Sequence, residues 1–296
     1  MAIIHYNHCP VCHSNTINPL LTVKDHSVSR EQFVIWQCSN CGLQFTQDVP
    51  DQDSIAPYYQ SSDYISHSNT SKGLINKVYQ RVREHTLNTK ADLVMARTKA
   101  RGKILDLGAG IGAFLHTMEK RNWQVTGLEP DPGARQVAKK LYHLNLEDSS
   151  ELSTMNSNSF DAITLWHVLE HVHDLHDYVE ELKRLLAKNG RIFIAVPNYE
   201  APEHDVYKLY WAAYDVPRHL YHFTPAAMKN LLGQHGLQIE EIRPMWFDSF
   251  YISLLSSKYK NGRTNWLGAG FAGIKTTLAT MFNKEKSSSL IYVIKA

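Results

Sequence analysis

A glycine-rich turn between a predicted strand and a predicted helix constrains the fold of this chain more than any other feature. The apolar run Ile104-Leu105-Asp106-Leu107 is typical of a short buried strand, and helical spacing begins at residue 113. Between them lies Gly108-Ala109-Gly110-Ile111-Gly112. Glycines let the backbone approach a ligand closely, and the N-terminus of the following helix faces that ligand. The turn therefore predicts an α/β fold with a small-molecule site at the end of this strand.

The rest of the chain after residue 103 alternates between strand and helix patterns. Further strands are predicted at 123–129, 160–165, 191–196, 237–242 and 289–294. Helices are predicted at 113–121, 133–142, 175–186 and 225–235, the third ended by Lys188-Asn189-Gly190. Apolar strands that alternate with helices form a mostly parallel sheet covered on both faces. We therefore predict a Rossmann-like, seven-stranded, mostly parallel sheet with helices on both faces.

The residues around the glycines indicate which ligand the turn holds. Glu129 ends the second strand, 21 residues after Gly108, where an acid can bind both ribose hydroxyls. Dinucleotide-binding turns read G-x-G-x-x-G, whereas here the third glycine comes one position early. Asp106 would also repel a pyrophosphate but could hold an ammonium group. The spacing favours a nucleoside joined to an amino acid, with a nicotinamide dinucleotide as the alternative.

All four cysteines fall into two C-x-x-C pairs, Cys9–Cys12 and Cys38–Cys41, separated by 25 residues. Two such pairs with convergent thiolates form a tetrahedral zinc site, and four thiolates leave no open position for a substrate. Gly42 suits the positive-φ position that such a turn needs. We predict a structural zinc ribbon with Cys9, Cys12, Cys38 and Cys41 as ligands. A redox dithiol, or a histidine (His5, His8 or His13) in place of one thiolate, is the alternative.

The composition excludes a strongly acidic or strongly basic chain. The formal net charge is +2, which gives no global drive toward nucleic acid or membrane. Residues 72–103 nevertheless carry nine Lys or Arg against two acids. This excess fits either a solvent-exposed basic helix face or a binding surface for an anionic substrate or partner. The N-terminal residues lack the pattern of a signal peptide, and no apolar stretch is long enough to span a bilayer. A cytoplasmic protein is expected.

From about residue 103 to 245 the sequence resembles the class I S-adenosylmethionine-dependent methyltransferases of the methyltransferase 23 or type 11/12 kind. The resemblance rests on the glycine turn, on Glu129 and on the segment from Phe160 to Val172. It implies S-adenosylmethionine as cofactor, with the turn around its methionine end and Glu129 on its ribose. It also implies Asp148, followed by Ser149, near the adenine, and Trp166 and His167 beside the transferable methyl group. The predicted cofactor-binding residues are Asp106, Gly108, Gly110, Gly112, Glu129, Asp148, Ser149 and Trp166.

The acceptor side is predicted from chemistry rather than from a motif. Residues 198–224 follow a strand end and combine aromatic side chains with Arg, Asp and His. Histidine is the natural general base near neutral pH. We predict His219 as the catalytic base and His167 as the second candidate, whereas His171 is expected to be structural. Arg218 would clamp an acceptor carboxylate or phosphate, or form a surface ion pair.

These features divide the chain into three predicted parts. Residues 1–48 form the zinc ribbon, 49–100 a linker with N-terminal helices, and 101–296 the methyltransferase domain. Substrate-side insertions are predicted at about 198–224 and 246–288. Apolar residues at helical spacing in the second insertion predict a helical cap, with a membrane-contacting or dimer-forming helix as the alternative.

The function predicted is methyl transfer to a small-molecule acceptor such as a saccharide, a lipid-linked compound or a secondary metabolite. Some ribosomal RNA methyltransferases also join a zinc ribbon to this fold, so an RNA methyltransferase is one alternative. A non-catalytic zinc-ribbon binding protein is the other.

Overall fold

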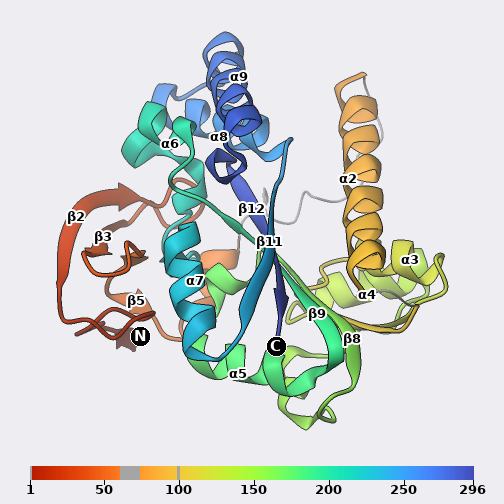
Figure 1. The fold of residues 1–296 in the computed structure, drawn as a ribbon. Helices are drawn as coiled ribbons and strands as arrows, with labels where there is room; N and C mark the ends of the chain where they lie inside the picture. The colour runs from red at the N-terminus through yellow and green to blue at the C-terminus, as the bar shows by residue number, and fades with distance from the viewer. Residues whose placement is uncertain (1, 61–73, 99–100) are drawn as a thin grey trace.

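The computed structural model describes residues 2–60, 74–98 and 101–296. Its centre is a six-stranded sheet with the order β11-β12-β9-β8-β6-β7 (Figure 1). The strands are β6 Lys103–Leu107, β7 Gln124–Leu128, β8 Phe160–Trp166, β9 Leu186–Pro197, β11 Gln238–Pro244 and β12 Ser289–Lys295. Strands β7, β6, β8 and β9 are parallel, and only β12 runs antiparallel to its neighbours. Beyond β7, a single parallel bridge from Leu128 to Glu147 stands where a seventh strand would lie. The predicted Rossmann-like class is confirmed.

Helices cover both faces of this sheet. They are α2 Leu74–Thr98, α3 Ala113–Glu119, α4 Pro132–Tyr142, α5 Leu175–Leu185, α6 Pro202–Tyr207, α7 Pro225–Gln234, α8 Asp248–Asn261 and α9 Trp266–Phe282. Short 3-10 helices are η1 Ala56–Tyr59, η2 Ser149–Thr154, η3 Leu169–His171, η4 Lys208–Tyr210, η5 Ala212–Tyr214 and η6 Lys284–Lys286. The turn predicted to end α5 lies inside β9 instead. There Asn189 has a positive φ of 69°, and the pairing with β8 shifts between Phe160 and Ala162.

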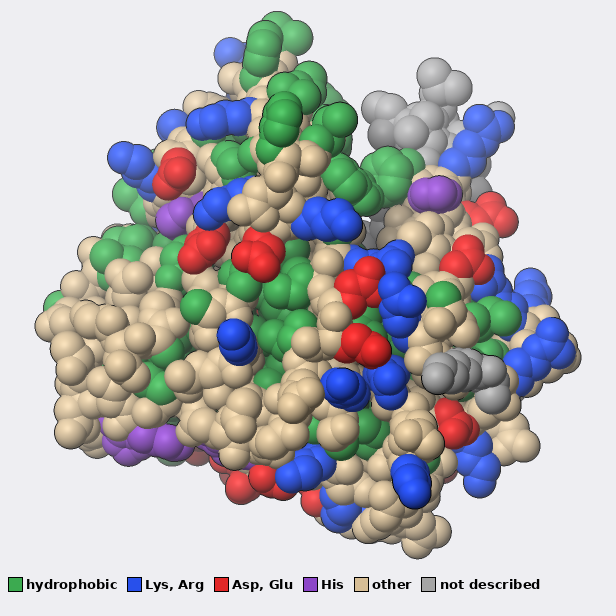
Figure 2. Space-filling view, viewed as in Figure 1, with side chains coloured by type: hydrophobic (Ala, Val, Ile, Leu, Met, Phe, Trp, Pro, Cys, Tyr) green, Lys and Arg blue, Asp and Glu red, His purple; other side chains and the backbone are tan. Residues whose placement is uncertain are grey.

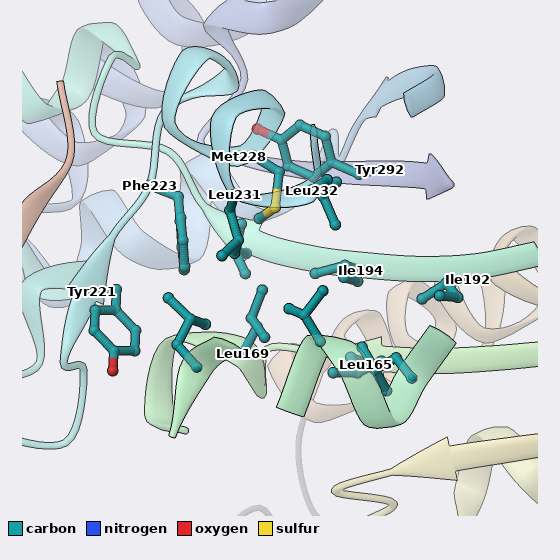
Figure 3. Packing of buried hydrophobic residues seen from close by; sticks show 14 of the residues in the cluster. Leu165, Leu169, Ile192, Ile194, Tyr221, Phe223, Met228, Leu231, Leu232 and Tyr292 are labelled. Atoms are coloured by element: carbon teal, nitrogen blue, oxygen red, sulfur yellow. The ribbon is translucent and has the colours of Figure 1, made fainter. Parts of the chain in front are cut away.

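The two faces of the sheet build separate cores because successive strand residues point to opposite sides. Ile192 and Ile194 pack with α5 and α7, as Figure 3 shows for the leucines and Met228 of that layer. Phe193 and Ala195 pack on the other face, with residues of α2 and α3. The sheet and the helices on its two faces thus form a three-layer α/β/α sandwich. In such folds a ligand binds at the carboxyl ends of the parallel strands, here β6, β7 and β8.

The N-terminal strands do not form a detached module. They are β1 Ile3–Ile4, β2 Ile17–Lys24, β3 Gln32–Cys38, β4 Gln44–Thr46 and β5 Val49–Pro50, and the late strand β10 Tyr221–His222 joins them. The antiparallel order is β10-β4-β3-β2, with Tyr221 opposite Phe45. A segment from the second half of the chain therefore completes the N-terminal sheet. The predicted domain limits at residues 48 and 100 stay a prediction.

Helices α8 and α9 form an antiparallel pair inserted between β11 and β12, at the top of Figure 1. Gly262, with φ +72°, ends α8, and the Asn265 side chain caps α9 by accepting from the Gly268 amide. The pair packs against α6. Within the part of the chain that the structure describes, no helix has both the length and the apolar character needed to cross a membrane.

Candidate active site and cysteine centre

The glycine turn has the backbone that its sequence predicts. Gly108, Gly110 and Gly112 have φ values of +63°, +55° and +77°, in the left-handed region that favours glycine. A Cβ on Gly108 would lie 2.6 Å from Cγ2 of Val168, so this position is filled. A Cβ on Gly110 would meet nothing within 4 Å. Gly110 therefore faces open space, where a ligand can reach the backbone.

Glu129 lies at the mouth of this turn. It follows β7, and its Oε2 accepts a hydrogen bond of 2.7 Å from the Gly110 amide, while Oε1 accepts one of 2.9 Å from the Asp131 amide. Burial raises the pKa of Glu129, and these two amides oppose the shift. The carboxylate is therefore fixed beside the open face of Gly110.

Asp106 is the buried acid of the site. It is 1% exposed, and its Oδ1 accepts a 2.6 Å hydrogen bond from Thr164 of β8. Burial raises the pKa of Asp106 to about 7, although Thr164 and the charge of Lys90 oppose the shift. Burial makes the charged form of this carboxylate costly. A cationic ligand would stabilise that charged form, because the opposite charge offsets the cost of desolvation.

Lys90 is a site residue that the sequence analysis did not identify. Its Nζ lies 4.3 Å from the centre of the Trp166 ring, and its charge acts on Asp106. Trp166 also packs edge-on against Phe114, with ring centroids 5.2 Å apart. The only sequence signal was the basic run 72–103, which does not tell an inward lysine from an outward one.

Asp148 and Ser149 lie along the same sheet edge as Glu129, because Glu147 pairs with Leu128. The Asp148 carboxylate is 2.7 Å from Arg135 Nη1 and caps η2 by accepting from the Ser150 amide. These contacts fix its position, although the side chain is half exposed. Its predicted role beside the adenine stays a prediction.

His167 lies between two carboxylates, with Nδ1 3.3 Å from Glu170 and Nε2 3.3 Å from Asp248. Burial alone would lower its pKa, but Asp248 and Glu170 raise the pKa of His167 to about 9. The ring is therefore protonated at neutral pH and has no lone pair to accept a proton. This geometry fits a positioning cation better than the base that the sequence suggested as second candidate.

A backbone carbonyl holds the His219 ring in one tautomer, while its predicted role as the base stays a prediction. Its Nδ1 is 2.8 Å from the carbonyl of Ala213, so Nδ1 carries the proton and Nε2 keeps its lone pair. His171 lies edge-on to it at 4.6 Å, and ligand atoms of Glu170, His171 and His219 lie within 4.8 Å of one another. Burial is the main cause that lowers the pKa of His171 to about 4, with a further contribution from the neighbouring His219, so the His171 ring is neutral. Glu170 thus connects the His219 cluster to His167.

Arg218 does not face the site. It is 2% exposed, and its five N–H groups donate to Asp25, Asp215 and the carbonyl of Tyr58. The clamp on an acceptor that the sequence allowed is wrong, because no donor remains. The alternative, a surface ion pair, is also wrong in its location, because the ion pair that Arg218 forms is buried between the N-terminal sheet and the later segment.

The four cysteine thiols converge as predicted. Cys9 Sγ lies 3.6 Å from Cys41 Sγ, Cys12 Sγ lies 3.6 Å from Cys38 Sγ, and all four atoms fall within 4.8 Å of one another. A tetrahedral site with zinc–sulfur bonds of about 2.3 Å requires sulfur atoms about 3.8 Å apart. Gly42 has φ +77°, as predicted. The arrangement fits zinc.

The neighbouring histidines have other partners. His5 Nδ1 lies 2.6 Å from Asp48, and His13 stacks on His176 with centroids 4.7 Å apart. The amides of Val11 and Cys12 each point at Cys9 Sγ from 3.5 Å. Such N–H groups stabilise thiolate ligands. The four-thiolate set therefore fits better than one containing a histidine.

A family model described as a methyltransferase domain matches residues 79–242, over half of the chain. An uncharacterized methyltransferase from Alkaliphilus oremlandii is 30% identical over 131 residues, which are 43% of this chain and 59% of that protein. A ubiquinone biosynthesis O-methyltransferase from Xanthomonas oryzae pv. oryzae is 29% identical over 181 residues, 55% of this chain and 75% of that protein.

Solved structures share the fold at low identity. An S-adenosylmethionine-dependent methyltransferase from Archaeoglobus fulgidus is 14% identical with a TM-score of 0.51, and the match covers 76% of this chain and all of that one. Geranyl diphosphate C-methyltransferase from Streptomyces coelicolor A3(2), solved with Mg²⁺, geranyl diphosphate and S-adenosyl-L-homocysteine, is 15% identical with a TM-score of 0.50. That match covers 77% of this chain and 87% of the other.

Proposed function

Because this chain belongs to the methyltransferase-domain family, within the class I S-adenosylmethionine-dependent methyltransferases, we propose that it transfers a methyl group to a small-molecule acceptor. The observation that carries the proposal is the open face of Gly110 between two buried acids, Glu129 and Asp106. One acid suits ribose hydroxyls and the other an ammonium group. This pairing is what a nucleoside joined to an amino acid needs.

The residues divide the work of the site. S-adenosylmethionine, when bound, supplies an electrophilic methyl group on a sulfonium. Asp106 and the glycine turn would hold the methionine end, and Glu129 the ribose. Trp166 would form an apolar wall that excludes water. Alignment and desolvation are the main contributions a protein makes to such a displacement.

His219 would accept the proton of the acceptor group at Nε2. The Ala213 carbonyl fixes the tautomer by accepting from Nδ1, 2.8 Å away. Protonated His167, held by Glu170 and Asp248, would orient the loop that follows β8. The acceptor class is supported by relatives that are named for small-molecule substrates.

We also propose that the four thiolates hold one structural zinc ion. Four thiolates leave no open position for a substrate, so the metal would hold the two C-x-x-C turns together rather than take part in the reaction. The support is the convergence of the four Sγ atoms.

Two cations of the basic run are not available to an RNA backbone. Lys90 lies against Trp166, and Arg97 pairs with Glu241 at 2.6 Å. Arg81, Arg101 and Lys103 of the same run are exposed, so the RNA methyltransferase alternative stays open and a salt-sensitive affinity for RNA would favour it.

Calorimetric titration with S-adenosylmethionine tests the proposal. Asp106→Asn keeps the shape but removes the charge, and the loss of a charge-assisted hydrogen bond, about 1.5–3 kcal/mol, predicts about 10- to 100-fold weaker binding. Asp161→Asn is the matched control, because Asp161 lies at the opposite end of β8 and accepts from the Lys103 amide. His219→Gln should bind the cofactor normally yet lose labelled methyl transfer to fractionated cell extract.

Two results would contradict the proposal. One is tight binding of a nicotinamide dinucleotide by a protein that ignores S-adenosylmethionine. The other is equal affinity of Asp106→Asn and the unsubstituted chain.

A further inference from the structure

Helix α9 turns its large apolar side chains outward and its small ones inward. The inward face consists of small residues that are buried against the rest of the chain: Ala269, Ala272, Gly273, Thr276 and Thr280. The outward face, here called the α9 crest, consists of six large apolar residues: Leu267, Phe271, Ile274, Leu278, Met281 and Phe282. Their side chains are between 51% and 92% exposed. This is the reverse of a helix that packs on a water-soluble core.

The small inward face is what allows α9 to lie in this orientation. A Cβ on Gly273 would come within 2.7 Å of the Phe250 ring of α8, so only glycine permits this close approach. Thr276 also donates a hydrogen bond to the buried carboxylate of Glu203 in α6. Rotating α9 to bury the crest would break both contacts. The exposed apolar face is therefore fixed by the packing.

The crest continues onto neighbouring residues. Trp266 is 63% exposed at the start of α9, and Trp246 and Phe247 are 43% and 44% exposed just before α8. Figure 2 shows hydrophobic side chains gathered at the top of the molecule, over α9, and again on the side that faces α2. A contiguous exposed apolar surface on a folded protein marks a docking site for a partner or a membrane.

The charges of residues 248–286 indicate whether a second protein or a membrane would cover this surface. Residues 248–286 contain six cationic side chains (Lys258, Lys260, Arg263, Lys275, Lys284 and Lys286) and two acids, Asp248 and Glu285. Asp248 is already held by His167. Lys275 stands among the exposed residues of the crest itself. Two copies of such a surface would repel each other, whereas anionic lipid headgroups would complement it.

We propose that the α8–α9 pair docks on an anionic lipid bilayer, with α9 lying in the interface and the crest among the acyl chains. An interfacial helix combines such an apolar face with cationic residues, whose stems lie in the apolar layer while their ammonium groups reach the phosphates. Spanning is not involved, since no described helix has the required length and apolar character. The proposal does not depend on methyl transfer.

The docking would place the acceptor side of the site at the membrane. Asp248, the first residue of α8, is 3.3 Å from His167, which lies beside Trp166. Under the proposed function, an acceptor with an apolar tail could therefore reach the site from the bilayer.

Co-sedimentation of the full chain with vesicles, without cofactor, tests the docking. Vesicles of phosphatidylcholine mixed with phosphatidylglycerol should bind the chain more tightly than vesicles of phosphatidylcholine alone. Phe271→Gln/Leu278→Gln should weaken binding by about tenfold or more, because two large apolar side chains lose their transfer out of water. Both sites are exposed, so the fold should be unaffected. Lys275→Glu/Lys284→Glu should abolish the preference for the anionic vesicles.

The matched control is Leu20→Gln/Leu141→Gln, whose residues are 45% and 44% exposed and lie on β2 and α4. It should sediment like the unsubstituted chain. The proposal is overturned if the chain stays in the supernatant with anionic vesicles, or if the crest variant sediments unchanged. It is also overturned if light scattering shows a dimer that the crest variant dissociates, since a second copy would then cover the crest.

Discussion

Replacing Arg218 with methionine should destabilise the chain far more than the loss of a surface ion pair. The guanidinium lies 3.1 Å from Asp25 and 2.6 Å from Asp215, and the side chains of Arg218 and Asp25 are at most 1% exposed. Methionine fills a similar length of the cavity without a charge. The substitution leaves two carboxylates without their cation, which for a buried pair costs about 3–5 kcal/mol.

The structure places the expected loss near the lower end of that range. Asp25 keeps hydrogen bonds from the amides of Ser27, Val28 and Ser29 at 2.7–3.1 Å, and the Asp215 side chain is 22% exposed. Both acids therefore retain partial compensation. We expect a loss of about 3 kcal/mol in the free energy of unfolding, which is a large part of the 5–15 kcal/mol typical of a folded protein.

Urea unfolding at neutral pH measures this loss. The control is Lys286→Met, which breaks the Lys286–Glu200 contact of 3.3 Å, where both side chains are 40% exposed. It should cost about 0–1 kcal/mol. Asp25→Asn/Arg218→Met should be less damaging than the two single losses added together, because it removes one of the two stranded charges, that of Asp25, along with its partner.

Acid titration gives a second readout of the same pair. Burial would raise the pKa of Asp25, but the Arg218 hydrogen bonds lower it from 3.8 to about 2. A depressed pKa stabilises the fold above the ordinary value of 3.8, and this contribution disappears as the pH falls through about 2. The difference between the unsubstituted chain and Arg218→Met should narrow in that window. A loss below about 1 kcal/mol at neutral pH would refute the reasoning.

Two further predictions concern the cation beside the site and the cysteine centre. The pKa of His167 is raised from 6.5 to about 9, so its contribution to stability should be complete below pH 6.5 and lost as the pH rises through about 9. His167→Gln should flatten that part of the stability–pH curve, and an unchanged curve would contradict the ion pairs. Metal analysis should find one zinc ion per chain, lost in Cys41→Ser but kept in His13→Ala; zinc loss in the histidine variant would contradict the four-thiolate site.

Local signals predicted the glycine turn, Glu129 and the cysteine set because each depends on residues close together in sequence. The φ values at Gly108, Gly110 and Gly112 follow from a strand that must turn at once into a helix. The helical spacing of residues 266–282 was also visible. Its direction was not, since the periodicity of large apolar residues is the same whether they face a core or the solvent. The position of Gly273 against Phe250 and the hydrogen bond from Thr276 to Glu203 fix it.

Contacts between distant segments could not be read from one sequence. Lys90 and Asp248 come from two elements that lie far in sequence from Trp166 and His167, and no motif connects them to these residues. The pairing of Arg218 with Asp25 could not be predicted either, because Asp25 lies 193 residues earlier. Chemistry alone suggested that an arginine in an aromatic segment would either bind an acceptor or form a surface ion pair. The fold instead used its charge to join two parts of the chain.

The N-terminal sheet has a direct connection to the proposed base. Thr46 of β4 donates its amide to the Leu220 carbonyl and its hydroxyl to the His219 carbonyl, at 2.9 and 2.7 Å. The Tyr214 hydroxyl donates to Gln44, and β10 pairs with β4 two residues after His219. The backbone that carries His219 therefore leads directly into β10, an edge strand of the sheet that contains Cys38. Since a base must be held to within a fraction of an ångström to act, loosening the thiolate cluster would displace His219 although no thiol lies beside it.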